Sequence, residues 1–202
     1  MFLFFDMGNV LLRFDHRRAA QQMAEVAGTD PERVWQVVFE SDLEFRFERG
    51  EISREEFYDV FCRETDTRPA FDALEHAGSA IFTPNYSIFG LIASLNAAGY
   101  HLGILSNTCE SHWRYCLETY EVIRTMTDVY VLSYEAQAMK PDAKIYQAAA
   151  DAAGVPPEEI FFTDDTTGHV EGARSFGFDA EIYTSTAQLV SDLIKRGIRS
   201  NY

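Results

Sequence analysis

The sequence lacks the paired cysteines that would indicate a disulfide framework or a zinc site. Among its 202 residues there are 3 cysteines, Cys62, Cys109 and Cys116, and no two of them form a CxxC pair. On a shared helix, Cys109 and Cys116 would lie about 10 Å apart, which is too far for a disulfide bond. Because unpaired thiols suit a reducing compartment, we expect a cytoplasmic protein.

Basic residues are scarce, and long apolar runs are absent. The 17 lysines and arginines stand against 32 aspartates and glutamates, which gives a formal net charge of -15. No apolar run approaches the ~20 residues of a transmembrane helix, and the apolar residues 2–5 are too few for a signal peptide. We therefore expect neither nucleic acid nor membrane as a partner, and the sequence leaves the oligomeric state open. An anionic substrate would need a metal ion, a lysine or a helix N-terminus to receive it.

What the sequence does contain is a substantial apolar core, which begins with its first residues. Hydrophobic residues make up 47% of the chain, which argues against global disorder. Met1 to Phe5 are apolar without alternation, which predicts a short strand buried on both faces. The run ends at Asp6, and Gly8 and Asn9 then allow a tight turn. This carboxylate either caps the turn or lies where open α/β sheets bind their ligands.

The next part of the chain reads as helical. Gly28 ends one apolar helical pattern, Asp30-Pro31 begins another, and Ser53 to Glu56 form a capping box. Nothing between residues 14 and 81 reads clearly as a strand. We expect an all-helical insert over residues 14–81, placed directly after the first strand.

After the insert, strands and helices alternate. We predict strands over residues 101–105, 128–132, 160–163 and 180–183. Predicted helices begin at Thr83-Pro84, cover residues 110–119, run from Lys140-Pro141 to Gly154, and cover residues 169–175 and 187–196. This alternation is typical of an α/β fold with a doubly wound parallel sheet. The expected core domain comprises residues 1–13 and 82–202.

Three of the predicted strands end in polar residues, at Asp6, at Ser106-Asn107 and at Asp164-Asp165. The carboxyl ends of parallel strands meet at one edge of a sheet, so we expect these residues to converge. Asp6 and Asp165 would then offer the oxygen ligands that Mg²⁺ prefers.

The same edge offers groups for phosphate chemistry. The Ser106 hydroxyl would hold a phosphate oxygen, Lys140 would neutralise charge, and Asp6 would attack phosphorus. Each residue also has an ordinary explanation. On that explanation, Ser106-Asn107 would only form a turn, Lys140 would be a solvated surface lysine, and Asp164-Asp165 would only cap the following helix. The functional interpretation is favoured by the order of these residues and by their placement at strand ends and helix starts.

At this point the chain resembles the haloacid dehalogenase superfamily, from Met1 to about Tyr183. Four motifs occur in the family's order: Phe4-Phe5-Asp6, Leu105-Ser106-Asn107, Lys140-Pro141-Asp142 and Phe162-Thr163-Asp164-Asp165. The resemblance implies a Rossmann-like core, Mg²⁺ as cofactor, Asp6 as nucleophile and metal ligand, and a helical C1 cap. It also implies a metal site completed by the Gly8 carbonyl and Asp165, with Asp164 as a further ligand or a neighbour. Ser106, Asn107 and Lys140 would bind the phosphate.

A narrower resemblance concerns the bacterial α-D-glucose-1-phosphate phosphatase branch. It rests on Asp6-Met7-Gly8-Asn9-Val10, on Glu48-Arg49-Gly50-Glu51-Ile52-Ser53 and on Met139-Lys140-Pro141. The resemblance implies a small phosphorylated metabolite as substrate, most simply a sugar phosphate. Glu48 and Arg49 of the cap would read the leaving group.

One position departs from the pattern of most phosphatases in this superfamily. They carry a second Asp two residues after the nucleophile, as general acid and base, and this chain has Gly8 there. Dehalogenases of the superfamily have Tyr at that position, so Gly8 argues against dehalogenation too. Two alternatives remain open: a non-catalytic protein that binds a phosphometabolite, and a phosphotransferase.

The missing acid also predicts the kind of leaving group. A positioned general acid contributes about 10²–10⁴-fold, most for a strongly basic leaving oxygen. An anomeric hydroxyl is more acidic than an ordinary alcohol. We therefore expect glucose 1-phosphate to be a better substrate than glucose 6-phosphate, with a water or His169 as a substitute acid. Replacing Gly8 by Asp should then help the 6-phosphate more, if the side chain fits.

Overall fold

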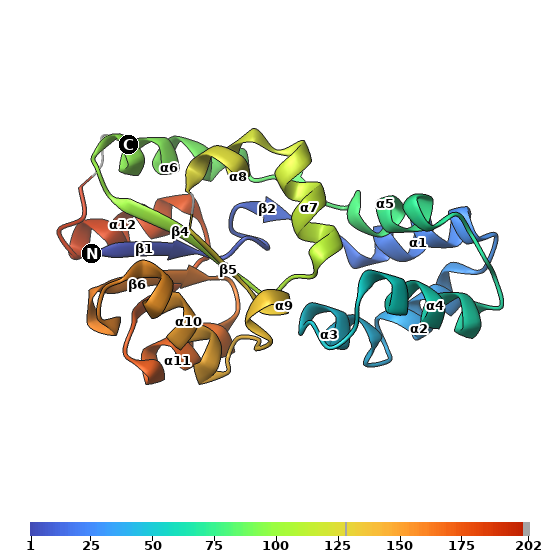
Figure 1. The fold of residues 1–202 in the computed structure, drawn as a ribbon. Coiled ribbons are helices and arrows are strands. Elements are labelled where there is room, and N and C mark those ends of the chain that lie inside the picture. The colour runs from blue at the N-terminus through green and yellow to red at the C-terminus, as the bar shows by residue number, and fades with distance from the viewer. Residues whose placement is uncertain (128, 200–202) are drawn as a thin grey trace.

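The computed structural model describes residues 1–127 and 129–199, which form a five-stranded parallel sheet flanked by helices (Figure 1). The strand order is β5-β4-β1-β6-β7. The bounds are β1 Phe2–Phe5, β4 His101–Ser106, β5 Tyr130–Leu132, β6 Ile160–Asp164 and β7 Asp179–Ile182. The predicted doubly wound α/β fold is confirmed. Asp128, where the third strand was predicted to begin, lies outside the described residues.

The central strand β1 is buried on both faces, as its unbroken apolar pattern predicts. Leu3 and Phe5 belong to one hydrophobic cluster, and Phe2 and Phe4 to another. The first cluster includes helices α6 Tyr86–Ala97, α7 Glu110–Thr119, α8 Glu121–Met126 and α12 Thr186–Lys195, and the second includes α10 Ala143–Ala153 and α11 Thr167–Phe176. Figure 1 shows α6 and α8 on one side of the sheet and α10 and α11 on the other.

Five helices lie beside the sheet as a separate group, on the right of Figure 1. They are α1 His16–Ala27, α2 Pro31–Val38, α3 Leu43–Glu48, α4 Arg54–Thr65 and α5 Phe71–Ser79. Their apolar faces form a hydrophobic cluster that includes Met23, Val34 and Phe61. A short antiparallel pair, β2 Leu12–Arg13 with β3 Thr83–Pro84, joins the two ends of the group to the sheet domain.

The helix ends follow the local signals in the sequence. Gly28 ends α1 in the left-handed region, the Asp30 carboxylate accepts a hydrogen bond from the Glu32 amide, and Ser53 and Glu56 form the predicted capping box. One predicted start is wrong. Thr83-Pro84 does not begin a helix, because it pairs with β2, and α6 begins at Tyr86.

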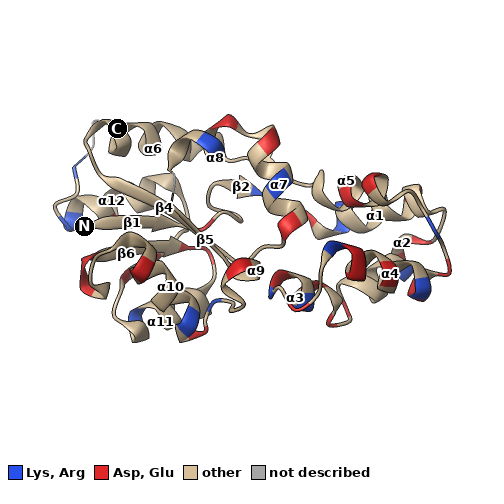
Figure 2. Ribbon diagram, viewed as in Figure 1, with Lys and Arg blue, Asp and Glu red and all other residues tan. Residues whose placement is uncertain are grey.

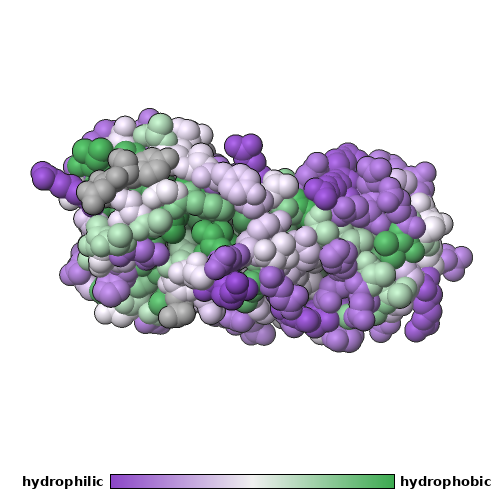
Figure 3. Space-filling view, turned by 90° about the horizontal axis from the view of Figure 1, so that it is seen from above, coloured by the Kyte–Doolittle hydropathy of each residue, from purple (hydrophilic) through white to green (hydrophobic). Residues whose placement is uncertain are grey.

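The view in Figure 2 shows charged residues on both parts of the molecule. Acidic residues occur on the sheet domain and on the helical group (Figure 2), and the view in Figure 3 shows a largely hydrophilic surface with separate hydrophobic spots. In residues 1–127 and 129–199, no helix is both long and apolar enough to cross a membrane.

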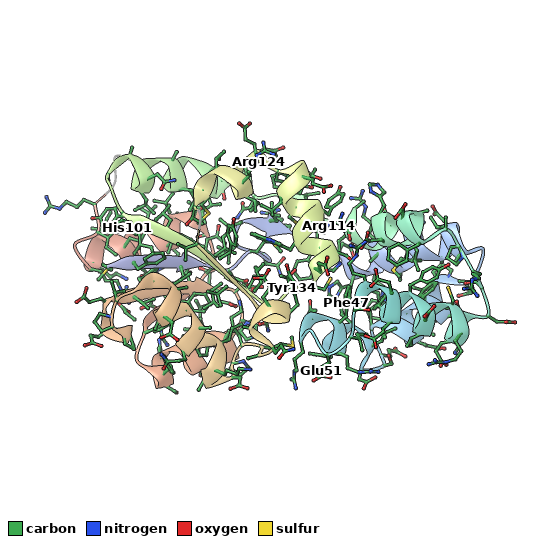
Figure 4. The ribbon with its side chains drawn as sticks, in the orientation of Figure 1. Phe47, Glu51, His101, Arg114, Arg124 and Tyr134 are labelled. Carbon is green, nitrogen blue, oxygen red and sulfur yellow. The ribbon has the colours of Figure 1, made fainter. Side chains whose placement is uncertain are left out.

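The helical group touches the sheet domain at α9 Ser133–Ala136, close to the ends of the strands. The Ser133 hydroxyl donates a hydrogen bond of 2.6 Å to the Glu48 carbonyl oxygen. Gly50 has φ +69°, and a Cβ there would overlap the backbone oxygen of Tyr134. Figure 4 labels Phe47 on α3 and Tyr134 on α9, on the two sides of this junction. Only glycine allows this close approach.

We therefore expect Gly50→Ala to disrupt the junction. Gly28→Ala is the matched control, because Gly28 has φ +66° with nothing within 4 Å of a Cβ. The control should lose about 1 kcal/mol of unfolding free energy from backbone strain. Gly50→Ala should lose about 1–3 kcal/mol more from overpacking. Urea unfolding of both variants measures the difference, and equal losses would mean that Gly50 is not held against α9.

Candidate active site

The polar residues that follow β1, β4 and β6 meet at one edge of the sheet, as predicted. Asp6 follows the central strand β1, and Ser106 and Asp164 are the last residues of the two strands that pair with it. Ser106 and Asp164 are buried, and Asp6 is 7% exposed. The chain thus holds two carboxylates in its interior, where unpaired charges are strongly disfavoured.

Lys140 provides the compensating charge, and it is a buried residue rather than a solvated surface lysine. Its ammonium lies 2.9 Å from Asp6 Oδ1 and 2.5 Å from Asp164 Oδ2. It also donates a hydrogen bond of 3.0 Å to the Leu105 carbonyl oxygen. One ammonium therefore bridges two carboxylates, and its third donor is anchored to the end of β4.

Asn107 positions Lys140 through both ends of its side-chain amide. Asn107 Oδ1 accepts a hydrogen bond of 2.8 Å from the Lys140 amide, and Nδ2 donates one of 3.1 Å to the Lys140 carbonyl. The side-chain amide of Asn107 is thus engaged with the backbone of Lys140, and phosphate binding by Asn107 stays a prediction. The Ser106 hydroxyl donates a long hydrogen bond of 3.3 Å to the Asn107 carbonyl oxygen. This weak contact leaves the hydroxyl available to a ligand.

Asp164 and Asp165 have different surroundings although they are neighbours. Asp164 Oδ1 accepts a hydrogen bond from the Thr166 amide, His169 Nδ1 lies 3.1 Å from both of its oxygens, and Oδ2 is taken by Lys140. Asp165 Oδ2 accepts one from the Asn9 side chain at 3.0 Å. Asp164 is therefore the residue that orients Lys140, and Asp165 has more freedom to bind a ligand.

The donor set fits a hard divalent cation such as Mg²⁺. One carboxylate oxygen each from Asp6, Asp164 and Asp165 can be chosen so that the three lie within 4.8 Å of one another. Backbone Gly8, predicted as a carbonyl ligand, lines the adjoining hollow. Oxygen donors without a soft ligand are typical of Mg²⁺ sites. Both oxygens of Asp164 already have partners, so Asp6 and Asp165 are better placed as ligands of the cation.

The charges of this cluster are unequally distributed. Burial raises the pKa of Asp6 to about 7, and Lys140 only partly offsets this effect. Burial would raise the pKa of Asp164 too, but Lys140 and His169 outweigh it and lower that pKa. Burial alone would lower the pKa of Lys140, and the two carboxylates raise it, so the ammonium stays charged. The cluster holds one positive charge for two carboxylates and favours a further cation.

The ring of Phe14 leaves no room for a side chain at Gly8. A Cβ at position 8 would lie 2.8 Å from Phe14 Cε1. The ring of Phe14 is itself packed on His16 and Phe82. An Asp at position 8 therefore does not fit unless Phe14 moves, and the space that a general acid would enter is occupied by an aromatic ring.

Glu48 of the helical group contributes to the lining of a hollow above the strand ends. The hollow is lined by Met7, Gly8, Phe14, His16, Glu48, Phe82, Ser106, Asn107, Thr108 and His112. Burial first, and the charge of Asp6 second, raise the pKa of Glu48 to about 7. His112, which is partly buried, also lines the hollow.

The lining includes neither the charged cluster of Asp6, Lys140, Asp164 and Asp165 nor the predicted participants Arg49 and His169. The Arg49 side chain is 52% exposed, with its guanidinium 3.8 Å from Glu51. Its predicted role in reading the leaving group has no support in this arrangement. His169 Nδ1 lies 3.1 Å from Asp164, and its role as a substitute acid stays a prediction.

Comparison with known proteins agrees with this fold. The sequence model of the haloacid dehalogenase-like hydrolases matches residues 2–177. A Mycobacterium tuberculosis protein named as a phosphatase is 28% identical over 199 residues, which cover 95% of this chain and 90% of that protein. An (S)-2-haloacid dehalogenase of Burkholderia cepacia is 33% identical over 88 residues, which cover 44% of this chain and 38% of the dehalogenase.

Solved structures show the same fold. A crystal structure of a family enzyme from Bacteroides thetaiotaomicron has a TM-score of 0.81 at 23% identity and covers 95% of this chain and 97% of that one. The same enzyme in complex with magnesium and inorganic phosphate has a TM-score of 0.77, at 23% identity and coverages of 90% and 92%. A hydrolase from Porphyromonas gingivalis has a TM-score of 0.78 at 22% identity, with coverages of 99% and 98%.

The raised pKa of Asp6 predicts that Mg²⁺ binding displaces a proton. Near pH 6 Asp6 is mostly protonated and near pH 8 it is ionised, because its pKa is about 7. Binding at pH 6 should therefore release close to one proton, and affinity should fall about tenfold per pH unit below 7. Calorimetry in two buffers of different ionisation enthalpy measures the release.

Two variants separate the groups that titrate here. The proton release should disappear in Asp6→Asn. It should persist in Glu48→Gln, although Glu48 has a similarly raised pKa. Equal proton release at pH 6 and pH 8 in the unmodified protein would contradict this assignment.

Proposed function

The chain belongs to the haloacid dehalogenase-like hydrolases, and on that premise we propose that it is a Mg²⁺-dependent phosphatase of a small phosphorylated metabolite. The observation that carries this proposal is the position of Asp6. Its carboxylate follows the central strand, is buried, and lies 2.9 Å from the buried Lys140 ammonium. The phosphatase name of the Mycobacterium relative and the magnesium and phosphate bound to the Bacteroides enzyme support it.

In the proposed reaction, an Asp6 oxygen attacks phosphorus. A bond forms between that oxygen and phosphorus, the bond from phosphorus to the alcohol oxygen breaks, and the alcohol takes a proton from water. Water then attacks the phosphorus of the aspartyl-phosphate, which releases inorganic phosphate and restores Asp6. The Ser106 hydroxyl would hold a phosphate oxygen during both steps, and the positive charge of Lys140 beside Asp6 would attract the phosphate. Bound Mg²⁺, held by Asp6, Asp165 and the Gly8 carbonyl, would supply charge stabilisation.

We also propose that residues 14–81 act as a cap on a core formed by residues 1–13 and 82–202. The cap would exclude water from the site and contribute Glu48 to its lining. A sugar phosphate such as glucose 1-phosphate stays the substrate predicted from sequence. A screen of phosphate release over sugar phosphates, nucleotides and phosphoacids tests the phosphatase against a non-catalytic binding protein. Products formed with an added alcohol acceptor test for a phosphotransferase.

Replacing the nucleophile should abolish turnover with the fold intact. Asp6→Asn keeps the shape and one oxygen but cannot form the acyl phosphate, so we expect phosphate release to fall about 10³-fold or more. Asp142→Asn is the matched control, because exposed Asp142 only caps α10 and Asn caps equally well. Steady-state rates and circular dichroism of both variants give the comparison. A substantial residual rate in Asp6→Asn would exclude covalent catalysis at this residue.

The two neighbouring cap residues should differ in their effect on selectivity. Glu48 lines the hollow, whereas Arg49 lies on the surface. Glu48→Ala should change the ratio of kcat/KM between a phosphorylated metabolite and a small aryl phosphate about tenfold, the size of one lost polar contact. Arg49→Ala should leave that ratio unchanged. A larger effect from Arg49→Ala would show that the cap sits differently over the site.

A further inference from the structure

Three side chains in the lining of the hollow above the strand ends have ordinary pKa values near or below neutrality. They are Glu48, His16 and His112. The same lining contains Gly8, where a carboxyl that could act as general acid is missing. Because the Phe14 ring fills the space that a side chain at position 8 would enter, a proton donor has to reach the leaving oxygen from another wall of the hollow.

The two histidines are poor candidates for that donor. Burial lowers the pKa of His112 to about 4, and burial also lowers the pKa of His16. Both rings are therefore mostly neutral at pH 7, and a neutral imidazole is too weak an acid to protonate a leaving alcohol. The His16 ring is also held in place, since it stacks on Phe39 with 4.9 Å between ring centroids and its Nε2 lies 3.4 Å from Glu44.

Glu48 combines a fixed backbone with an unpartnered carboxyl. It is the last residue of α3, and its carbonyl oxygen accepts the hydrogen bond from the Ser133 hydroxyl. The close approach of Gly50 to Tyr134 fixes the chain two residues later. Within residues 1–127 and 129–199, however, the Glu48 carboxyl makes no hydrogen bond and no ion pair. A carboxyl partly withdrawn from water normally has such partners, so this one is available to a bound molecule.

The electrostatic surroundings suit a group that both gives and takes a proton. Burial first and Asp6 second raise the pKa of Glu48 to about 7, and Lys140 partly offsets them. Both forms of the carboxyl are therefore populated at neutral pH, where a general acid and base works best. Asp6 and Lys140 act on Glu48 through their charge, and in the described part of the chain neither is hydrogen-bonded to it.

We propose that Glu48 is the general acid and base of the reaction, supplied by the helical group in place of the carboxyl that is missing at Gly8. The proposal rests on the phosphatase function proposed above, and it gives Glu48 the part that water takes there. When an Asp6 oxygen bonds to phosphorus, the bond from phosphorus to the alcohol oxygen breaks, and that oxygen takes the proton of the Glu48 carboxyl. In the second step the Glu48 carboxylate takes a proton from the attacking water, the bond from phosphorus to Asp6 breaks, and the protonated Glu48 is restored.

A proton donor at Glu48 also widens the range of leaving groups. Gly8 alone predicts a preference for acidic leaving oxygens such as an anomeric hydroxyl. With Glu48 as donor, phosphate esters of ordinary alcohols become substrates as well. Glu48 then contributes most for the most basic leaving oxygens.

Two esters with different leaving groups test the proposal. Benzyl phosphate releases a basic alkoxide, whereas 4-nitrophenyl phosphate releases a phenolate that needs no proton. Glu48→Gln keeps the shape and polarity of the side chain. In this variant kcat/KM for benzyl phosphate should fall about 10²-fold or more, beyond the loss of a polar contact, and that for 4-nitrophenyl phosphate should stay within about threefold.

Glu44→Gln is the matched control for this comparison. Glu44 lies one turn earlier on α3, has a pKa raised to about 8, and is not part of the lining. Its replacement should change kcat/KM for neither ester. Equal losses on both esters in Glu48→Gln would overturn the proposal while the phosphatase function stands.

The second step provides a readout that a merely structural role would not move. With ³²P-labelled 4-nitrophenyl phosphate, Glu48→Gln should form the aspartyl-phosphate at a normal rate. The label should then leave the protein about 10²-fold more slowly than in the unmodified protein, because no base activates the water. Loss of the label at the unmodified rate would overturn the role of Glu48 as base.

The pH dependence of the unmodified protein is an independent measurement that needs no variant. Above the pKa of Glu48, the ratio of kcat/KM for benzyl phosphate to that for 4-nitrophenyl phosphate should fall about tenfold per pH unit, because one ester alone needs the proton. The other titratable or charged groups around Glu48 are Asp6, Lys140, Glu44, Cys109, His16 and His112. Titration of Asp6 affects both esters equally and cancels in the ratio.

The outcomes separate this proposal from the function on which it rests. A ratio that stays constant from pH 6 to pH 9, with both esters hydrolysed, would overturn the role of Glu48 alone. Absence of turnover of both esters in the unmodified protein would overturn the phosphatase function and the proposal with it.

Discussion

The contact on which the rest of this site depends is the bridge of one buried lysine between two buried carboxylates. Lys140 lies between Asp6 and Asp164, and Asn107 fixes its backbone from both sides. Such a bridge stabilises the charges only if every group is held in place, since a buried charge without a partner costs several kcal/mol. The pairing is uneven, because Asp164 has further contacts with the Thr166 amide and the His169 ring, whereas Asp6 accepts one further hydrogen bond from the Met7 amide. Asp6 is left with a raised pKa and with capacity for another cation, as expected of a carboxylate that binds metal and substrate.

The strand order of the sheet brings the polar strand-end residues together, and the helical group places Glu48 above them. Strand β1 is central, so Asp6 has a neighbouring strand end on each side. The close approach at Gly50 and the hydrogen bond from Ser133 hold the end of α3 against α9, which places Glu48 above the strand ends. Burial and the nearby charge of Asp6 raise the pKa of Glu48, so this carboxyl favours protonation or a nearby cation. Asp6 thus follows a strand of the sheet domain, and Glu48 ends a helix of the separately packed helical group.

Much of this arrangement was predictable from sequence, because the relevant signals are local. The unbroken apolar run of β1, the capping box at Ser53 and the glycine after α1 each determine a strand or helix end within a few residues. Convergence of Asp6, Ser106 and Asp164 follows from the rule for parallel strands. The pairing of Thr83-Pro84 with β2 was not predictable, because that contact joins residues about 70 positions apart. The positioning role of Asn107 and the exposure of Arg49 likewise depend on long-range packing. Phe14 shows the same limit: nothing in the local sequence indicates that its ring fills the space beside Gly8.

The central claim is that Asp6, held by Lys140, becomes covalently phosphorylated during turnover. Rapid acid quench with a ³²P-labelled phosphate ester and Mg²⁺ tests it most directly, followed by mass spectrometry of the peptide that contains Asp6. The account predicts transient label on the protein before steady state, located on Asp6 and released by hydroxylamine as an acyl phosphate would be. Full-rate phosphate release with no label on the protein, or label on another residue, would contradict it.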